Sequence, residues 1–261
     1  MSIHVNFSVR SEIGHVRENN EDNFFCNGIF MSPSEREKPF FMNGTAEVPC
    51  VFAVFDGMGG HDLGELASLT AAETLSEHFG SVLKGSHEEI DSYVIDANRR
   101  LREIMRANNI MTGTTLAMVV AGENSFTAYN IGDSRIYKVN NGFLVRVSED
   151  HTVEEEMILS GQLSPKREGT TMFAHQLTRF LGMGESYGVP EPDIYALNDY
   201  EENRRAVICS DGLSGMLRHK EMSDIMKKAG TVSEAVNALV DAALEKGGND
   251  NVTCIVMEFV K

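Results

Sequence analysis

The stretch TLAMVVAGENSFTAYNIGDSRIYKVNNGFLVRV, residues 115–147, decides the fold class because it alternates short apolar runs with turn residues. Runs of this length, separated by glycine, asparagine and aspartate, are typical of strands joined by tight turns. Strands joined in this way pair antiparallel, so the stretch predicts a β-meander. Its predicted strands cover residues 115–121, 125–131, 135–139 and 143–147.

Two further apolar runs, one on each side of this stretch, end close to an acid that glycine follows. Residues 50–55 lead directly into Asp56, and residues 206–209 lead into Asp211 after one serine. A wholly apolar run of this length that stops at a turn residue predicts a buried strand. A final strand is predicted at residues 252–260.

Helix starts are marked where a capping residue is followed three positions later by glutamate. Asp62, Ser86 and Thr231 have this pattern, and apolar side chains at helical spacing follow the last two. The helices do not alternate with single strands, so the order of elements excludes a doubly wound parallel sheet. It predicts the α+β class, an antiparallel β-sandwich flanked by helices on both faces.

No repeat, low-complexity tract or flexible linker divides the chain, so residues 1–261 are predicted to form a single domain. Residues 150–192 show little periodicity beyond a short helix start at Thr152, and a mobile surface insert is expected there. The chain begins without a secretory signal and ends just after its last predicted strand. A free-standing unit in the cytoplasm is therefore expected.

The composition argues against several classes of partner. The 23 basic and 39 acidic residues give a net charge of −16, which repels nucleic acid and anionic membrane surfaces. No apolar run is long enough to span a bilayer. The scattered cysteines fit neither a zinc site nor a disulfide framework, and reduced thiols are expected at Cys26, Cys50, Cys209 and Cys254.

Acids at strand ends and turns are the features most indicative of function. They are Glu21, Asp22, Asp56, Asp133, Asp211 and Asp250. If folding gathers them, their mutual repulsion requires a cation, and hard oxygen ligands favour Mg²⁺ or Mn²⁺ over zinc. The alternative for any single acid is a turn, a helix cap or a solvated surface position.

Other common binding and catalytic sites are excluded because their sequence motifs are absent or incomplete. The chain has no P-loop, no EF-hand loop and no nucleophile elbow. The run GMGGHD at residues 57–62 begins like a dinucleotide-binding loop, but Asp62 stands where the third glycine belongs.

Eight motifs, in order, resemble the metal-dependent serine/threonine phosphatases of the protein phosphatase 2C (PPM) type in their bacterial form. The resemblance runs from about Ser11 to Glu258. The motifs are Gly14-x-x-Arg17-x-x-Asn20-Glu21-Asp22, Phe55-Asp56-Gly57-Met58-Gly59-Gly60, Gly113-Thr114-Thr115, Ile131-Gly132-Asp133-Ser134-Arg135, Asp150-His151-Thr152, Leu177-Thr178-Arg179-x-Leu181-Gly182, Ser210-Asp211-Gly212-Leu213 and Asp250-Asn251-Val252-Thr253.

The resemblance implies two stacked antiparallel sheets with a metal centre in the cleft between them. Asp56 is then expected to bridge two Mn²⁺ or Mg²⁺ ions, one of which also binds the carbonyl of Gly57. Asp211 and Asp250 are expected to hold the other ion. Glu21 or Asp22 would act through bound water, Asp133 with Asp211 corresponds to a third-metal site, and Arg17 is similar to the arginine that grips the substrate phosphate.

The resemblance also implies the reaction. Two cations that share an oxygen lower the pKa of bound water, so that hydroxide attacks a phosphoserine or phosphothreonine monoester directly, without a phosphoenzyme. Two departures from the family pattern concern the site. Glu12 replaces an aspartate that makes an outer metal contact, and Met58 replaces a histidine proposed as general acid, which leaves His61 or water for that role.

Two alternatives stay open at this point. A catalytically silent binding module would keep the fold but is expected to lose core acids, whereas Asp56, Asp211 and Asp250 are all present. A hydrolase acting on nucleic acid is disfavoured by the net charge of −16. The expected partners are phosphorylated proteins and, from the family, an opposing serine/threonine kinase. A monomer is expected, and the 150–192 segment resembles the family's variable flap, on which substrate choice is expected to depend.

Overall fold

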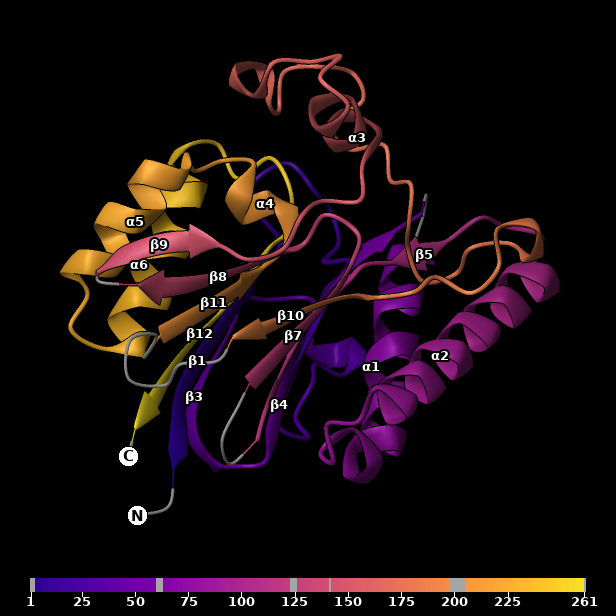
Figure 1. Ribbon diagram of the computed structural model, residues 1–261, viewed down its shortest axis with the longest axis horizontal. Coiled ribbons are helices and arrows are strands. Elements are labelled where there is room, and N and C mark those ends of the chain that lie inside the picture. The colour runs from indigo at the N-terminus through magenta and orange to yellow at the C-terminus, as the bar shows by residue number, and fades with distance from the viewer. Residues whose placement is uncertain (1–2, 60–62, 123–125, 141, 198–204, 261) are drawn as a thin grey trace.

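The computed structural model describes residues 3–59, 63–122, 126–140, 142–197 and 205–260, which form two antiparallel sheets stacked face to face (Figure 1). The sheet that we call the β12 sheet has the order β3 (Phe40–Glu47), β1 (His4–Glu12), β12 (Val252–Val260), β11 (Arg205–Cys209), β8 (Arg135–Asn140) and β9 (Phe143–Arg146). The β4 sheet has the order β10 (Asp193–Leu197), β7 (Phe126–Ile131), β6 (Leu116–Ala121), β4 (Cys50–Met58) and β2 (Asp22–Cys26), with β5 (Gly113–Thr114) paired to the end of β4.

Helices cover the outer face of each sheet. The helices α1 (Leu63–Val82) and α2 (His87–Asn108) lie over the β4 sheet, and α4 (Asp211–Ser214), α5 (His219–Lys228) and α6 (Val232–Glu245) lie over the β12 sheet (Figure 1). Ser86 and Thr231 cap α2 and α6 as predicted, since each side chain accepts a hydrogen bond from the backbone three residues on. None of the helices in the described part of the chain is both long and apolar enough to cross a bilayer.

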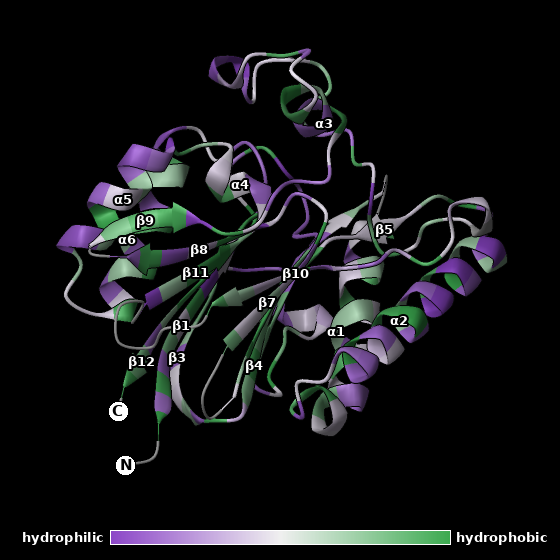
Figure 2. Ribbon diagram, in the orientation of Figure 1, coloured by the Kyte–Doolittle hydropathy of each residue, from purple (hydrophilic) through white to green (hydrophobic). Residues whose placement is uncertain are grey.

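Three layers of apolar side chains hold this α-β-β-α arrangement together. One lies between the sheets and includes Phe52 and Ile255, and the other two lie beneath the helix pairs on either side. The strands are accordingly apolar along most of their length, whereas α2 shows one apolar and one charged face (Figure 2). The predicted α+β sandwich with helices on both faces is confirmed.

The predicted meander is wrong in one respect. The strands β6 and β7 pair within the β4 sheet and β8 and β9 pair within the β12 sheet, so residues 132–134 cross between the sheets instead of forming a hairpin. The crossing places Phe126 of β7 and Ile136 of β8 in the same apolar core between the sheets, where both are buried. Gly132 has a φ of +103° at the crossing, a conformation that few other residues adopt.

Five strands and two α-helices of the described structure have no counterpart among the predicted elements. They are β1, β2, β3, β5, β10, α4 and α5. The strand β3 shows why, since its side chains are alternately half-buried and exposed and few of them are strongly apolar. It lies at the edge of its sheet, where little apolar surface is needed.

The first part of the 150–192 segment, which contains α3 (Val153–Leu159), stands above the two sheets (Figure 1). The segment also contains the short 3₁₀ turns η2 (Pro165–Arg167) and η3 (Glu185–Tyr187), and a third 3₁₀ turn, η1 (Pro33–Glu35), follows β2. Thr152 caps α3 as predicted. The segment is tied down at its base, where Arg135 makes ion pairs of 2.6 Å with Asp150 and 2.7 Å with Glu168.

Candidate metal centre

The strand β4 carries Asp56 to the end of its sheet facing the cleft. Asp56 lies opposite Asp22 in the register of β4 and β2, which brings two carboxylates to neighbouring strands. On its other side, the Asp56 backbone N–H donates to Thr115 Oγ1 (2.9 Å), and its carbonyl accepts from the Thr115 N–H (3.0 Å). The backbone of Asp56 is therefore fixed by three adjacent segments.

The β12 sheet supplies Asp211 and Asp250 to the same cleft. Asp211 begins α4 just after β11, and Asp250 precedes β12, which is the neighbour of β11. Gly212 packs so closely on this region that a Cβ at its position would lie 2.0 Å from the Asn251 carbonyl oxygen. This contact sets the separation between the two acids.

Asn251 holds the loop that delivers Glu21 and Asp22. Its amide nitrogen donates to the carbonyls of Ile13 and Asn19, both at 2.8 Å, and its amide oxygen accepts from the Glu21 N–H at 2.8 Å. Asp22 is then buried, and its carboxylate accepts a hydrogen bond of 2.7 Å from Ser210 Oγ. One side chain from the end of the chain therefore positions both acids of the first motif.

Asp133 enters the site from the crossing between the sheets. His151 fixes this crossing through two hydrogen bonds of 3.0 Å to Gly132. The Nδ1 atom of the ring accepts from the Gly132 N–H, and the backbone N–H of His151 donates to the Gly132 carbonyl. Asp133 is left with only 7% of its surface exposed.

Repulsion among these carboxylates dominates the electrostatics of the site. Burial raises the pKa of Asp56 well above its ordinary value, and the charges of Asp22, Asp211, Asp133 and Asp250 raise it further. Burial and neighbouring acids likewise raise the pKa of Asp133, and that of Asp22 to about 7. A buried cluster of this kind, with oxygen donors from both sheets, fits a divalent cation, which would favour the ionised form of every member.

Glu21 and the carbonyl of Gly57 converge on one point beside this cluster. A Cβ added to Gly64 would lie 2.8 Å from Glu21 Oε1 and 2.9 Å from the Gly57 carbonyl oxygen, so both oxygens reach the space above this glycine. The Gly57 N–H also donates to the Glu21 carbonyl at 3.2 Å. The structure therefore brings together all seven oxygen donors that the sequence predicts as metal ligands, from Glu21, Asp22, Asp56, Gly57, Asp133, Asp211 and Asp250.

Arg17 lies at the rim of the cluster, with 49% of its side chain exposed. Its guanidinium is 2.8 Å from Asp250 Oδ2, so its ion-pair partner is neither of the glutamates, Glu18 and Glu21, that stand close to it in sequence. The positively charged guanidinium of Arg17 therefore faces solvent beside the acids.

Two further residues noted in the sequence are Glu12 and His61. Glu12 lies on the face of β1 that packs on α6, where its carboxylate is 2.7 Å from Arg10, which in turn binds Asp241. The Glu12 carboxylate is therefore paired with Arg10 on this face of β1. His61 lies outside the described residues.

His175 is a residue of the site that the sequence did not indicate. Its Nδ1 is 2.9 Å from Asp211 Oδ2, and this hydrogen bond, more than any other interaction, raises the pKa of His175 to about 9. Burial favours the neutral form of Asp211, yet hydrogen bonds from His175 and Asp56 outweigh it and lower the pKa of Asp211. A histidine in a loop, 36 positions from its partner, gives no local signal in the sequence.

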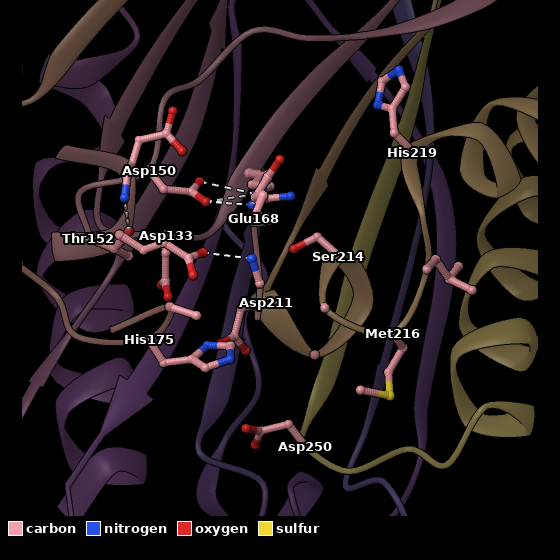
Figure 3. Close-up of a pocket in the computed structure, with 18 of the residues that line it drawn as sticks. Asp133, Asp150, Thr152, Glu168, His175, Asp211, Ser214, Met216, His219 and Asp250 are labelled. Atoms are coloured by element: carbon pink, nitrogen blue, oxygen red, sulfur yellow. Dashed lines mark hydrogen bonds and ion pairs between the residues drawn. The ribbon is translucent and has the colours of Figure 1, made fainter. Parts of the chain in front are cut away.

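A cavity of about 650 Å³ opens over the acids. Asp133, His175, Asp211 and Asp250 lie along one side of it, and His219 lies on the other (Figure 3). The 150–192 segment contributes part of the wall, so a bound molecule would touch both the acids and this segment.

Comparison with known proteins gives one consistent match. Residues 8–252 match the family model described as protein phosphatase 2C. The serine/threonine phosphatase stp of Listeria monocytogenes is 28% identical over 258 residues, which cover 95% of this chain and 94% of that protein.

Solved structures agree with this match. The catalytic domain of the serine/threonine phosphatase PstP with two manganese ions has a TM-score of 0.79 and 25% identity, with 100% of both chains covered. The PPM phosphatase MsPP of Mycobacterium smegmatis, in complex with cacodylate, has a TM-score of 0.78 and 29% identity, with 97% of both chains covered. The chain therefore belongs to the protein phosphatase 2C family.

Proposed function

We propose that the protein hydrolyses phosphoserine and phosphothreonine monoesters of proteins with the help of divalent cations. The observation that carries this proposal is the gathering of acids from both sheets around Asp56, whose pKa is raised by four other carboxylates. Such a cluster is costly to fold unless cations occupy it. Relatives of similar length, which are serine/threonine phosphatases, support the same conclusion.

The residues present would hold two ions, Mn²⁺ or Mg²⁺. Asp56 would bind both, the Gly57 carbonyl one of them, and Asp211 with Asp250 the other. Glu21 and Asp22 would orient water, and Asp133 with Asp211 would hold a third ion. The two manganese ions of the PstP structure support the choice of metal. When bound, such ions supply Lewis-acid chemistry that lowers the pKa of water at the site.

Several side chains of this protein have roles that follow from their contacts. Ser210 donates to Asp22 Oδ2 and so fixes the orientation of this buried carboxylate. Arg17 would exchange its contact with Asp250 for the substrate phosphate, for which a guanidinium is a good bidentate partner. The local charge of Arg17 and the cations would thus attract an anion to a molecule of net charge −16.

We assign substrate choice to the 150–192 segment, which we take to be a flap within one catalytic domain of residues 1–261. The segment lines the cavity through residues that include Glu154, Glu168 and His175. A phosphorylated peptide lying over the acids would therefore contact it on either side of the phosphate. We expect a monomer in the cytoplasm that opposes a serine/threonine kinase.

The test is release of inorganic phosphate from a phosphothreonine peptide by the full chain. We expect turnover with Mn²⁺ and none after EDTA treatment, with recovery when Mn²⁺ is restored, because the acids hold the ions reversibly. A chain that binds Mn²⁺ and remains folded, yet releases no phosphate from any phosphoserine or phosphothreonine peptide, would instead be a silent binding module.

Replacing Arg17 by alanine should weaken substrate binding more than turnover. A charge-assisted bidentate contact contributes about 1.5–3 kcal/mol, so we expect KM for the phosphopeptide to rise by roughly 10-fold or more. Arg99→Ala is the matched control, since Arg99 is an exposed arginine that pairs with Asp96 and Glu103 on α2. A KM for Arg17→Ala equal to that of the control would remove Arg17 from the phosphate site.

A further inference from the structure

A loop of the 150–192 segment brings a nitrogen donor to the carboxylates of Asp133 and Asp211. One ligand atom from each of Asp133, His175 and Asp211 lies within 4.8 Å of the others. The closest pair, His175 Nδ1 and Asp211 Oδ2, is 2.9 Å apart. Adjacent ligands of one octahedral ion with bonds of about 2.1 Å lie about 3 Å apart, so this pair has the spacing of ligands to a single ion.

Asp133 gives an independent indication that a cation belongs here. Asp133 is 7% exposed, and within the described residues its carboxylate has no hydrogen bond or ion pair with another side chain, only a hydrogen bond from its own backbone and the nearby charge of His175. These interactions compensate the burial of the carboxylate only in part, and a coordinated cation is one of the few ways to compensate the rest. The burial of Asp133 is an observation separate from the hydrogen bond between His175 and Asp211.

The backbone that directly follows His175 is bonded to the base of the segment. The Val153 N–H donates to the Gln176 carbonyl at 2.9 Å, and the Thr178 N–H donates to the His151 carbonyl at 2.8 Å. Thr152 and Leu177 form an isolated bridge between these two bonds. The loop thus returns to the base of the segment directly after His175, which holds the imidazole over the acids (Figure 3).

We propose that His175 is a nitrogen ligand to the ion that Asp133 and Asp211 hold. The inference rests on the proposed function, since it concerns a third ion beside the two at Asp56. An imidazole among carboxylates favours a transition-metal ion such as Mn²⁺, whereas Mg²⁺ strongly prefers oxygen ligands. The ion would also tie the 150–192 segment to the crossing between the sheets.

Pulsed EPR of the full chain loaded with Mn²⁺ tests the bond directly. We expect a nitrogen hyperfine coupling to Mn²⁺ in the unchanged protein and its loss in His175→Ala. Calorimetric titration should show the weakest Mn²⁺ site losing roughly 10- to 100-fold in affinity in this variant, with a smaller change for Mg²⁺. Trypsin should cleave after the exposed Lys166 and Arg167 more slowly with Mn²⁺ in the unchanged protein, but not in His175→Ala.

His219→Ala is the matched control. His219 lines the same cavity but bonds the Leu144 carbonyl at 2.9 Å, so its removal should leave the nitrogen coupling in place. A coupling that persists in His175→Ala, or that is absent from the unchanged protein while Mn²⁺ binds and phosphate is released, would overturn the inference and leave the proposed function standing. Absence of both Mn²⁺ binding and phosphate release would overturn both.

Discussion

Asp56→Asn should lower kcat for phosphate release by about 10³-fold or more while making the ion-free protein more stable. The loss of activity follows because Asp56 faces carboxylates from both sheets, and an amide binds divalent cations poorly. Several kcal/mol of transition-state stabilisation would be lost with the ions, and each ~1.4 kcal/mol is tenfold in rate. Initial rates at saturating Mn²⁺ and phosphopeptide measure this effect.

The gain in stability comes from removing a buried charge that neighbouring acids repel when no cation is bound. Without cations, the charge of Asp56 is repelled by four other acids, and its removal should raise the free energy of unfolding in EDTA by about 1–3 kcal/mol at neutral pH. Thermal unfolding in EDTA checks it. The control is Asp224→Asn, which removes an exposed carboxylate on α5 and should change neither the rate nor the stability noticeably. Equal stability of Asp56→Asn and the unchanged protein in EDTA would contradict the repulsion.

The same repulsion makes the ion-free protein depend on pH in a defined direction. A carboxyl group whose pKa is higher in the folded state binds its proton more tightly there, so its contribution to stability is full below the unfolded pKa and is lost as pH rises through the folded pKa. For Asp22 these values are 3.8 and about 7. The unfolding temperature in EDTA should thus fall between about pH 4 and pH 7, and fall less in Asp56→Asn.

The acids of the site could be predicted from the sequence because their signal is local. An apolar run that ends in Asp-Gly identifies both a buried strand and a carboxylate at its end, which is how Asp56 and Asp211 were found. Because 155 positions separate Asp56 from Asp211, the sequence alone does not show that folding brings the two carboxylates together. The resemblance to a known family supplied the roles, and the structure supplied the proximity.

What could not be predicted depends on contacts between distant segments. The crossing at Gly132 looks like a hairpin turn in sequence, because a glycine followed by an acid fits both. Only the packing of β7 against β8 across the core distinguishes the two. His175 stands in a loop without periodicity, and its significance comes from its hydrogen bond to Asp211 and its closeness to Asp133.

Gly212 shows how tightly the two acids of the β12 sheet depend on packing. A methyl group at this position would lie 2.0 Å from the Asn251 carbonyl oxygen and 3.3 Å from Asp250 Cβ. Neither atom is the end of a flexible side chain, so the backbone itself would have to move. The start of α4, with Asp211, and the start of β12, with Asp250, would then separate.

Gly212→Ala should therefore lower both stability and Mn²⁺ affinity. Overpacking of this kind costs about 1–3 kcal/mol in the free energy of unfolding, measured by urea denaturation in EDTA, where bound ions do not contribute. Mn²⁺ affinity by calorimetry should fall at least about tenfold even at temperatures where the variant is fully folded, because supporting contacts of a metal site commonly have effects of this size. Gly80→Ala is the matched control: Gly80 lies in α1 with no atom near its missing Cβ, and alanine there should raise stability by about 0.5–1 kcal/mol and leave Mn²⁺ affinity unchanged. A Gly212→Ala protein that loses stability but binds Mn²⁺ like the Gly80→Ala protein would show that Asp211 and Asp250 do not have to stay in register to hold the ions.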